Sequence, residues 1–452
     1  MKWLIHEWRL LQRSRLSLVA LFLLLGLTTM AVYSGLHEVE RQRQIIARLA
    51  PLHEQDAAAV AAQYAGGGDA GRPAYYTFYN TWDAPSDAAF LAMGLRDATP
   101  YVLRVRALGL QAQLYEGEVF NPELALPGRF DFAFVLIYLV PLFVIALLHD
   151  LVSVERQSGR LRLLLSLPDG MQAWQRRVAL RYGLLLACLT LPVTIGAVIA
   201  GTAASTLGVV LAVVASYLAF WVGLALLVAA RGWRSVTNAT ALMGAWVLLT
   251  LILPTLANVV LVRGIPVHQG VDLMLAQRQA VHGAWEIPRE ETMRRFFASH
   301  PEWKETEPLP AGFHWKWYFA FHQVGDESVA EQAQAYREGL LARQAWADRA
   351  GWLLPGVGAQ AALHHLAGTD LPAQSAYQDR IAAFHQQIRA FYYPYLFSDR
   401  PFDVVDFQAR PVFQPQPHDA ESGSANTLLL LMLCWLVAGW GMRGIGRQYS
   451  AH

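Results

Sequence analysis

The chain has few charged residues for its length and almost no lysine. Of its 452 residues, 16% are charged and 54% are hydrophobic, and the mean hydropathy is +0.26. Lysine occurs only as Lys2, Lys304 and Lys316. With a formal net charge of +1, the chain lacks the basic excess that attracts polyanions, which excludes nucleic acid as a partner on electrostatic grounds. The composition favours a membrane protein over a soluble one.

Cysteine is equally scarce. The two cysteines, Cys188 and Cys434, both lie inside apolar runs, so the sequence predicts neither a disulfide framework nor a thiolate metal site. Both are interpreted as small core hydrophobes.

The sequence also lacks nucleotide-binding and hydrolytic motifs. A P-loop requires a lysine directly after a glycine, and none of the lysines meets that condition. His-Glu-x-x-His and Gly-x-Ser-x-Gly stretches are missing as well, so there is no positive case for a membrane hydrolase. We therefore expect that the chain is not an enzyme, that it holds no cofactor and that any ATP is hydrolysed by another polypeptide.

Six apolar runs are long enough to cross a bilayer, whose hydrocarbon core of about 30 Å requires roughly 20 helical residues. They cover residues 16–36, 132–149, 178–203, 206–230, 238–262 and 426–442. The runs carry essentially no ionisable residue at mid-depth, since Arg181 and His149 lie at their ends. A proton- or ion-coupled carrier is therefore disfavoured. The predicted fold class is a membrane all-α protein with six transmembrane helices.

The arginines of the short flanking segments set the orientation. They precede the first run, fill the segment between the second and third runs, and follow the fourth and sixth. The positive-inside rule places all of these segments in the cytoplasm, together with both termini. Segments 37–131 and 263–425 then lie outside the cytoplasm, and residues 443–452 form a cytoplasmic tail.

Residues 1–15 are predicted to form a helix in the cytoplasmic interface, because apolar and basic residues alternate there with helical spacing. The residues expected to lie in this interface are Trp3, Trp8, Arg9 and Arg13. A charged flank that only sets topology is the simpler alternative. A cleaved signal sequence ending near Ser34 is disfavoured, because the first apolar run is longer than a usual signal core.

The two outer segments are predicted to form a mainly helical extracytoplasmic domain. Helical spacing continues from the first span to three glycines at 66–68 and recurs in 288–301, 326–351 and 372–393. The triplet Asp326-Glu327-Ser328 is interpreted as the acidic start of a helix. Histidines are frequent in the second segment, but their spacing fits no ligand motif, so no metal site is predicted.

The segment 150–177 carries the most informative sequence, which is Glu155-Arg156-Gln157-Ser158-Gly159-Arg160-Leu161-Arg162-Leu163-Leu164-Leu165-Ser166-Leu167-Pro168. Leucines and arginines fall on opposite sides of a helix that the proline would end, which predicts an amphipathic piece along the membrane surface. Such a piece can receive force from a partner. A basic loop held by anionic headgroups is the alternative.

This run, followed by a basic cluster and a span, resembles the signature of ABC-2 permeases. In that family a glutamate, a glycine and a leucine-rich stretch closing on proline lie beside the coupling helix that meets the ATPase, and Arg160 stands where a threonine often follows the glycine. The resemblance implies an ABC-2, type V exporter-like permease. It implies that the residues coupling to the ATPase are Glu155, Arg156, Gly159, Arg160, Leu164, Pro168, Arg176 and Arg177.

Further stretches narrow the resemblance. Asn121-Pro122, the run 128–131 and the segment 355–370 are similar to a subfamily of ABC-2 permeases of unknown function with large periplasmic insertions after the first and fifth transmembrane helices. The resemblance implies a location in the bacterial inner membrane. Its implied partners are the lipid bilayer, a second permease, identical or paralogous, and two copies of an ATPase subunit that binds ATP and Mg.

The expected function is export driven by that ATPase, whose closure would push on the 150–177 loop and the N-terminal helix. The substrate is unknown, and the uncharged spans suit an amphipathic or lipid-like cargo. The alternative is a mechanotransmitter that drives a periplasmic partner and moves no substrate across the bilayer, because the outer segments are larger than a conduit requires. A membrane enzyme or a receptor with a periplasmic sensory domain is a third, weaker interpretation.

Overall fold

The structure is a computed structural model that describes residues 7–9, 12, 14–66, 68–115, 130–161, 170–267, 270–283, 285–416 and 425–450. Most of these residues are helical. The α-helices are α2 (Arg15–Tyr64), α3 (Gly71–Tyr76), α4 (Leu110–Tyr115), α6 (Phe132–Phe134), α7 (Val140–Leu148), α8 (Ser153–Gln157), α10 (Gly170–Ala200), α11 (Ala204–Ala229), α12 (Ser235–Val247), α13 (Leu253–Gly264), α14 (Gly270–Gly283), α15 (Arg289–Ser299), α16 (Trp315–Ser328), α17 (Ala330–Ala350), α18 (Pro355–Ala367), α19 (Leu371–Phe397), α20 (Val404–Gln408) and α21 (Ala425–Ser450).

Shorter elements complete the described chain. The 3₁₀ turns are η1 (Ala89–Leu91), η2 (Gly94–Asp97) and η5 (Pro301–Trp303), and the π turns are η3 (Val135–Leu139) and η4 (Leu248–Ile252). The strands β1 (Tyr79–Trp82) and β2 (Val102–Val105) pair antiparallel, with Tyr79 opposite Val105.

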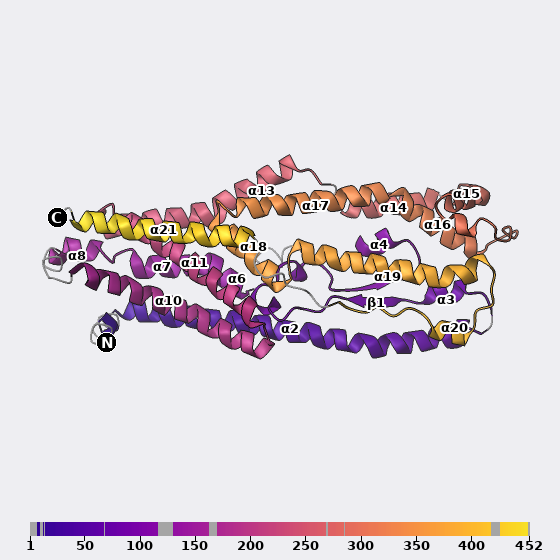
Figure 1. Cartoon of the computed structure of the whole chain (residues 1–452), viewed down its shortest axis with the longest axis horizontal. Helices are drawn as coiled ribbons and strands as arrows, with labels where there is room; N and C mark the ends of the chain where they lie inside the picture. The colour runs from indigo at the N-terminus through magenta and orange to yellow at the C-terminus, as the bar shows by residue number, and fades with distance from the viewer. Residues whose placement is uncertain are drawn as a thin grey trace.

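The molecule is elongated (Figure 1). Both termini lie at one end, near α8 and α10, whereas α3, α15, α16 and α20 lie at the other. One hydrophobic core joins the N-terminal half of α2 to α7, α10, α11 and α21, and a second, rich in aromatic residues, joins α3, α4, α16 and α19. We call the first part the bundle, made of the N-terminal half of α2 with α6–α8, α10–α13 and α21. We call the second the distal domain, made of the C-terminal half of α2 with β1, β2, α3, α4, α14–α17, α19 and α20.

The described residues include six helices that are long and apolar enough to cross a membrane, by length and composition. They are Arg15–Tyr64, Phe132–Gln157, Trp174–Ala200, Ala204–Ala229, Ser235–Gly264 and Asn426–Gly446. The prediction of a mostly helical membrane protein is confirmed at this level, whereas the ABC-2 arrangement stays a prediction. The first helix has 50 residues and continues unbroken beyond its apolar part, so it is about 75 Å long.

Pro141 accounts for an irregular turn in the second apolar helix. Proline has no N–H, so the carbonyl of Ile137, four residues earlier, loses its usual helical donor. The backbone widens here into η3, and the hydroxyl of Tyr217 on α11 donates to Ile137 O at 3.0 Å. The indole of Trp246 on α12 donates to Tyr138 O at 3.1 Å. Two neighbouring helices therefore supply donors to the irregular turn, which fixes their register against it.

Small residues let α21 approach α11 closely. A Cβ atom on Gly223 of α11 would overlap with the backbone of Ala438, and one on Gly441 would overlap with Gly223. At the same interface the indole of Trp435 donates to Ser216 Oγ at 3.0 Å. Glycine contacts and side-chain hydrogen bonds are the interactions that associate apolar helices in a membrane. The C-terminal helix is thereby held within the bundle.

The second half of α2 forms one edge of the distal domain. Arg410, after α20, pairs with the carboxylate of Glu54 on α2 through contacts of 2.9 and 3.0 Å. Tyr79 of β1 and Tyr392 of α19 are both buried, and their hydroxyls share a hydrogen bond of 2.9 Å. Burying a tyrosine requires such a partner for its hydroxyl. The distal domain is therefore built from two segments that lie far apart in the sequence.

Phe90 of η1 joins the bundle to the distal domain, and we call this contact the Phe90 junction. Its side chain is fully buried in the bundle core. A Cβ atom on Gly35 of α2 would overlap with the Phe90 carbonyl, and one on Gly196 of α10 would lie 2.9 Å from Phe90 Cε2. Asp131, which caps α6, also accepts the N–H of Met93 at 3.0 Å. The turn that carries Phe90 is thus fixed to three bundle helices.

One sequence interpretation is wrong. The triplet at 326–328 does not start a helix but forms the last turn of α16, and α17 begins at Ala330. Carboxylates favour helix N-termini wherever those lie in the sequence, and Asp326 does cap a helix, namely α4. It accepts the backbone N–H of Leu110 at 2.9 Å and that of Gln111 at 3.3 Å.

The Phe90 junction predicts opposite effects for two glycines of α2. Gly35→Ala should destabilise the protein by about 1–3 kcal/mol, because the added methyl group forces η1 away from α2. Gly26→Ala is the matched control: it has open space around its Cβ position, and alanine is the better helix former. Thermal unfolding of the two purified variants in detergent measures the difference. Equal melting temperatures would contradict the close contact.

Candidate functional site

Four charged residues meet at the end of the bundle that carries the termini, and we call them the Arg177 cluster. Arg177 of α10 contacts Glu7 Oε2 through Nε at 3.0 Å and Glu155 Oε1 through Nη1 at 3.3 Å. Arg160 Nε lies 3.2 Å from Glu155 Oε2. The cluster therefore ties together α8, α10 and the segment before α2.

Burial decides which of these contacts is strong. The side chains of Glu7, Glu155 and Arg177 are 10%, 20% and 19% exposed, whereas that of Arg160 is 61% exposed. An exposed ion pair contributes roughly 0–1 kcal/mol, but removing one partner from a shielded pair leaves an unpaired charge at a cost of several kcal/mol. Arg177 is thus the central residue of the cluster, because it neutralises two shielded carboxylates at once.

The residues just after Glu155 form a defined turn. Gly159 has φ +70°, the left-handed conformation that ends a helix and that other residues adopt at a cost. Its N–H bonds to Arg156 O at 3.1 Å. The guanidinium of Arg156 donates to Trp233 O at 2.6 Å, which joins α8 to the turn between α11 and α12. The turn is therefore fixed on its α8 side and open at Gly159.

The structure brings together some of the predicted coupling residues and separates others. Glu155, Arg160 and Arg177 are in contact, whereas Arg156 and Arg176 turn to other partners, Trp233 O and Gln172 Oε1. Among the predicted interfacial residues, Trp8 and Arg9 are exposed on a short helical segment. The predicted residues Trp3, Arg13, Leu164 and Pro168 lie outside the described part of the chain.

Sequence reasoning misses Glu7 as a member of the cluster. One feature of the sequence does indicate an ion pair of Glu7, which is the one acidic residue in an otherwise basic N-terminal segment. An isolated carboxylate among arginines favours pairing with one of them, but the sequence gives no indication that the partner is 170 positions away.

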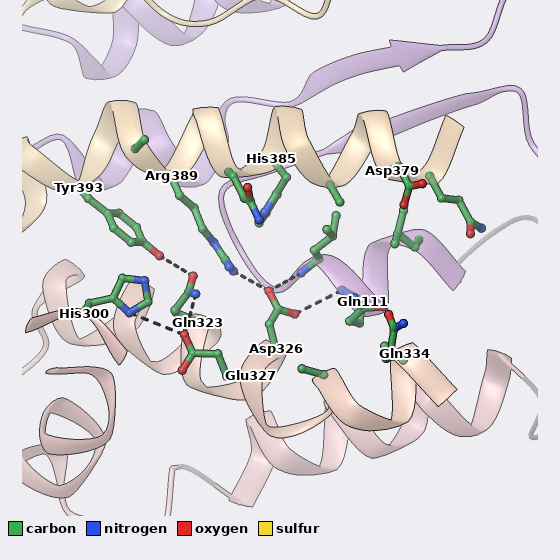
Figure 2. Close-up of a pocket in the computed structure, with 18 of the residues that line it drawn as sticks. Gln111, His300, Gln323, Asp326, Glu327, Gln334, Asp379, His385, Arg389 and Tyr393 are labelled. Carbon is green, nitrogen blue, oxygen red and sulfur yellow. Dashed lines mark hydrogen bonds and ion pairs between the residues drawn. The ribbon is translucent and has the colours of Figure 1, made fainter. Parts of the chain in front are cut away.

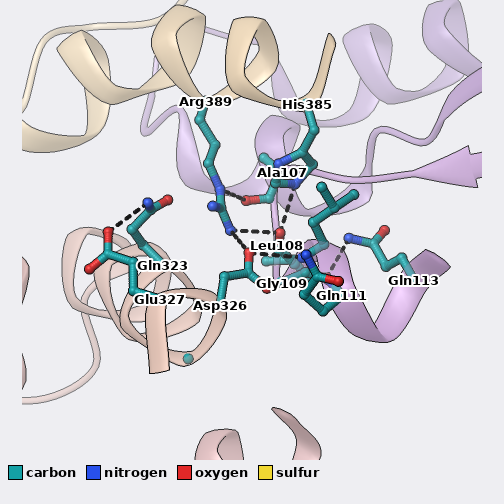
Figure 3. A network of polar contacts seen from close by, with 12 residues as sticks. Ala107, Leu108, Gly109, Gln111, Gln113, Gln323, Asp326, Glu327, His385 and Arg389 are labelled. Carbon is teal, nitrogen blue, oxygen red and sulfur yellow. Dashed lines mark hydrogen bonds and ion pairs between the residues drawn. The ribbon is translucent and has the colours of Figure 1, made fainter. Parts of the chain in front are cut away.

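A second polar network lies in the distal domain, centred on Asp326 (Figure 3). Besides the two N–H groups of α4, the Asp326 carboxylate accepts from Gln277 Nε2 at 2.7 Å and from Arg389 Nη2 at 2.7 Å. Arg389 also donates to Leu108 O at 2.9 Å, and His385 Nε2 lies 2.8 Å from the same oxygen. Burial holds the pKa of His385 well below its usual value, and the positive charge of Arg389 acts in the same direction.

Beside this network a groove of about 670 Å³ opens between α17 and α19 (Figure 2). Its lining comes from α4, α16, α17, α19 and the turn around η5, and combines charged and amide side chains with alanines, leucines and two aromatic rings. The residues that line it are Leu110, Gln111, Leu114, His300, Glu302, Trp303, Gln323, Asp326, Glu327, Ala330, Ala333, Gln334, Arg337, Gln378, Asp379, Ala382, His385, Gln386, Arg389, Ala390 and Tyr393. Sequence reasoning does not find this groove, because its walls come from five separate elements.

The histidines of the second outer segment do not gather into a ligand set where the structure describes them. Among the described residues there is no group of three or more His, Cys, Asp or Glu that could hold a metal ion. His268 and His418 lie outside those residues.

One family model matches part of the chain. Residues 272–416 match the family described as "Domain of unknown function (DUF3526)". The match runs from α14 to the segment after α20, so it contains Asp326, Arg389 and most of the groove, and of the bundle core only the residues of α18. No curated protein and no solved structure matches the chain.

The Arg177 cluster predicts a clear difference between its two arginines. Arg177→Gln should destabilise the protein by about 2–4 kcal/mol, because two shielded carboxylates are left facing each other. Arg160→Gln should cost at most about 1 kcal/mol, because its ion pair is exposed. Melting temperatures of both variants in detergent, at low and high salt, measure the effect. If the two variants were equally stable, Arg177 would not be the central residue.

His322 on α16 predicts a pH dependence of stability. Both of its ring nitrogens are shielded from solvent and have no hydrogen-bond partner in the part of the chain that the structure describes. Burial lowers the pKa of His322 to about 3, and Arg389 and Arg106 act in the same direction. The unfolded chain binds the proton near pH 6.5, so stability is complete above about pH 6.5 and falls as the pH drops towards 3.

Lowering the pH from 7.5 to 5 should therefore reduce the free energy of unfolding by about 2 kcal/mol through His322. His322→Phe should remove that share of the pH dependence, since the ring lies between Tyr318 and Phe321. His282→Gln, at an exposed position of α14, is the matched control and should leave the pH dependence unchanged. Unfolding of the three proteins at both pH values tests this; an unchanged pH dependence in His322→Phe would refute it.

Proposed function

We propose that the chain is the permease subunit of an ABC-2-type exporter whose ATP is hydrolysed, with Mg, by two copies of a separate subunit. In this proposal a second permease, identical or paralogous, completes the complex in the bacterial inner membrane. The bundle end with the termini faces the cytoplasm, and the distal domain is periplasmic. The observation that carries the proposal is the Arg177 cluster, which contains three of the residues expected to couple to the ATPase.

Coupling requires a contact element that is exposed to a partner and firmly attached to the spans. The α8 turn meets both requirements. Gly159 and Arg160 are exposed, as is Val154 on the first turn of α8. Glu155 and Arg156 attach the same turn to α10 and to the start of α12. A push on the exposed side is therefore transmitted to two apolar helices rather than absorbed by a loose loop.

The N-terminal segment gives the same contact a second point of attachment. Glu7 bonds to Arg177 at 3.0 Å, and the neighbouring Trp8 and Arg9 are exposed. A partner bound at this end would touch the start of α2 and the α8 turn together. A partner can shift the permease only if its ATP-bound and ATP-free forms make different contacts with it. In this proposal those different contacts are made at this surface.

The proposal predicts which substitution uncouples the complex. The tagged chain, purified from native membranes in mild detergent, should bring an ATPase subunit with it, identified by mass spectrometry. Glu155→Gln should lower ATP hydrolysis about tenfold while the ATPase still co-purifies, because the turn loses its tie to α10. Glu40→Gln, exposed on the distal half of α2, is the matched control and should retain full activity.

Two results would contradict the assignment. One is recovery of the chain without an ATPase under conditions that preserve other membrane complexes. The other is full activity of the Glu155→Gln complex. That result would show that the ATPase binds the chain but that the α8 turn does not couple it to the apolar helices.

A second function, mechanotransmission to a periplasmic partner, is favoured by the length of α2. This single helix runs from the Arg177 cluster to Glu54 and its partner Arg410 in the distal domain. The Phe90 junction attaches the distal domain to α2 and α10. A displacement of the bundle helices would therefore reach the far end of the molecule. Transport of a cargo by the complex in proteoliposomes would rule this function out.

A further inference from the structure

The groove between α17 and α19 has the length of an extended peptide. Its α19 wall includes residues 378, 382, 386, 390 and 393, which repeat at helical spacing and so share one face. From Gln378 to Tyr393 this face extends about 22 Å. An extended chain rises about 3.3 Å per residue, so six or seven residues of a strand would fill the groove from end to end.

Small side chains keep the groove open. Ala330 and Ala333 of α17 face Ala382 and Ala390 of α19 across it. None of the residues of α17 is buried, so this helix packs against its neighbours, α19 included, without entering the core of the domain. At one end the ion pair between Arg337 and Asp379 links the two helices.

The polar lining suits a peptide backbone. Amide side chains both donate and accept hydrogen bonds, as a backbone in strand conformation requires on its free edges. The lining includes the amide side chains of Gln378 and Gln386 on α19 and of Gln111 on α4, and Figure 2 shows Gln111 on the α4 side of the groove. Apolar side chains larger than alanine are few, so the groove is poorly suited to a lipid tail.

The charges of the lining select the sign of the ligand. Four carboxylates, Glu302, Asp326, Glu327 and Asp379, face two guanidinium groups, Arg337 and Arg389. Asp326 and Asp379 are each paired with one of these arginines. Glu302 and Glu327 have no lysine or arginine partner among the described residues, which leaves two negative charges. Anionic ligands such as phosphate esters are therefore repelled.

Glu302 and Glu327 lie at the η5 end of the groove, next to Trp303. Glu327 Oε1 lies 3.7 Å from His300 Nδ1, which neutralises it only when the imidazole is protonated. Glu327 accepts from Ser299 Oγ and Gln323 Nε2, both at 2.9 Å, which fixes its direction. A lysine ammonium or arginine guanidinium here would form charge-assisted hydrogen bonds to the carboxylates. The partly exposed indole ring beside them offers a cation–π contact.

We propose that this groove binds an extended polypeptide segment that carries a basic side chain, with the backbone along Gln378 and Gln386 and the cation against Glu302, Glu327 and Trp303. The site lies wholly in the distal domain, so the proposal stands whether or not an ATPase drives the bundle. It assigns the distal domain a partner of defined chemistry, a basic strand-forming segment of another protein.

The test uses the full-length protein in detergent and a peptide of about eight residues, made of alanine, glutamine and lysine and labelled with a neutral fluorophore. Fluorescence anisotropy should show binding of this peptide, at least about tenfold tighter than that of the matched peptide with glutamate in place of lysine. Binding should weaken as salt is raised, since part of the attraction is electrostatic. An excess of a neutral oligosaccharide should not displace the peptide.

Variants locate the binding site. Glu302→Gln combined with Glu327→Gln should weaken binding of the lysine peptide about tenfold, and Ala382→Trp should abolish binding by filling the groove. Glu305→Gln, exposed three residues from Glu302 and outside the lining, is the matched control and should bind normally. Glu302 is itself exposed, so Glu302→Gln alone tests the site even if Ala382→Trp fails to fold.

Three outcomes would overturn the proposal. The first is equal affinity for the lysine and glutamate peptides. The second is an equal loss of binding in Glu305→Gln and Glu302→Gln, which would indicate general charge attraction. The third is displacement of the peptide by the oligosaccharide, which would assign the groove to a hydroxyl-rich ligand instead.

Discussion

The distal domain depends on the hydrogen bonding of one carboxylate, that of Asp326. A buried negative charge is tolerated only when donors surround it, and here the donors come from α4, α14 and α19. Satisfying this charge brings the first outer segment into contact with three helices of the second. Arg389 extends the network to Leu108 O. The groove lies next to this centre, since Asp326 and Arg389 both belong to its lining.

The bundle has its own polar centre at the opposite end, and the apolar core of the bundle lies between the two along the N-terminal half of α2. The Arg177 cluster attaches the α8 turn to α10, and the Phe90 junction then relates α10 and α2 to the distal domain. Dense apolar packing resists compression, so a movement of α10 is passed on rather than taken up locally. This arrangement suits both proposed functions, since export and mechanotransmission each require motion to travel between the ends.

The sequence predicts well those features that depend on local patterns. The apolar run at 206–230 corresponds to α11, because hydropathy alone decides that such a stretch is helical. Contacts between distant residues cannot be predicted in this way. No residue near Glu7 in the sequence indicates that Arg177 is its partner. The alanines of α17 and α19 indicate only helix formation, and not that they line a groove. The acidic triplet at 326–328 misleads for a related reason, since Asp326 caps a helix more than 200 positions away in the sequence.

The pairing of early with late residues also constrains how the chain matures. The hydrogen bond between Tyr79 and Tyr392 joins residues 313 positions apart, and the ion pair between Glu54 and Arg410 joins residues 356 positions apart. Neither contact can form before the later residue has been synthesised. During synthesis the first outer segment has therefore left the ribosome long before its partners exist, while most of the apolar helices are still to be inserted. Until those partners are synthesised, β1 and β2 lack the α19 side chains that cover them in the complete domain.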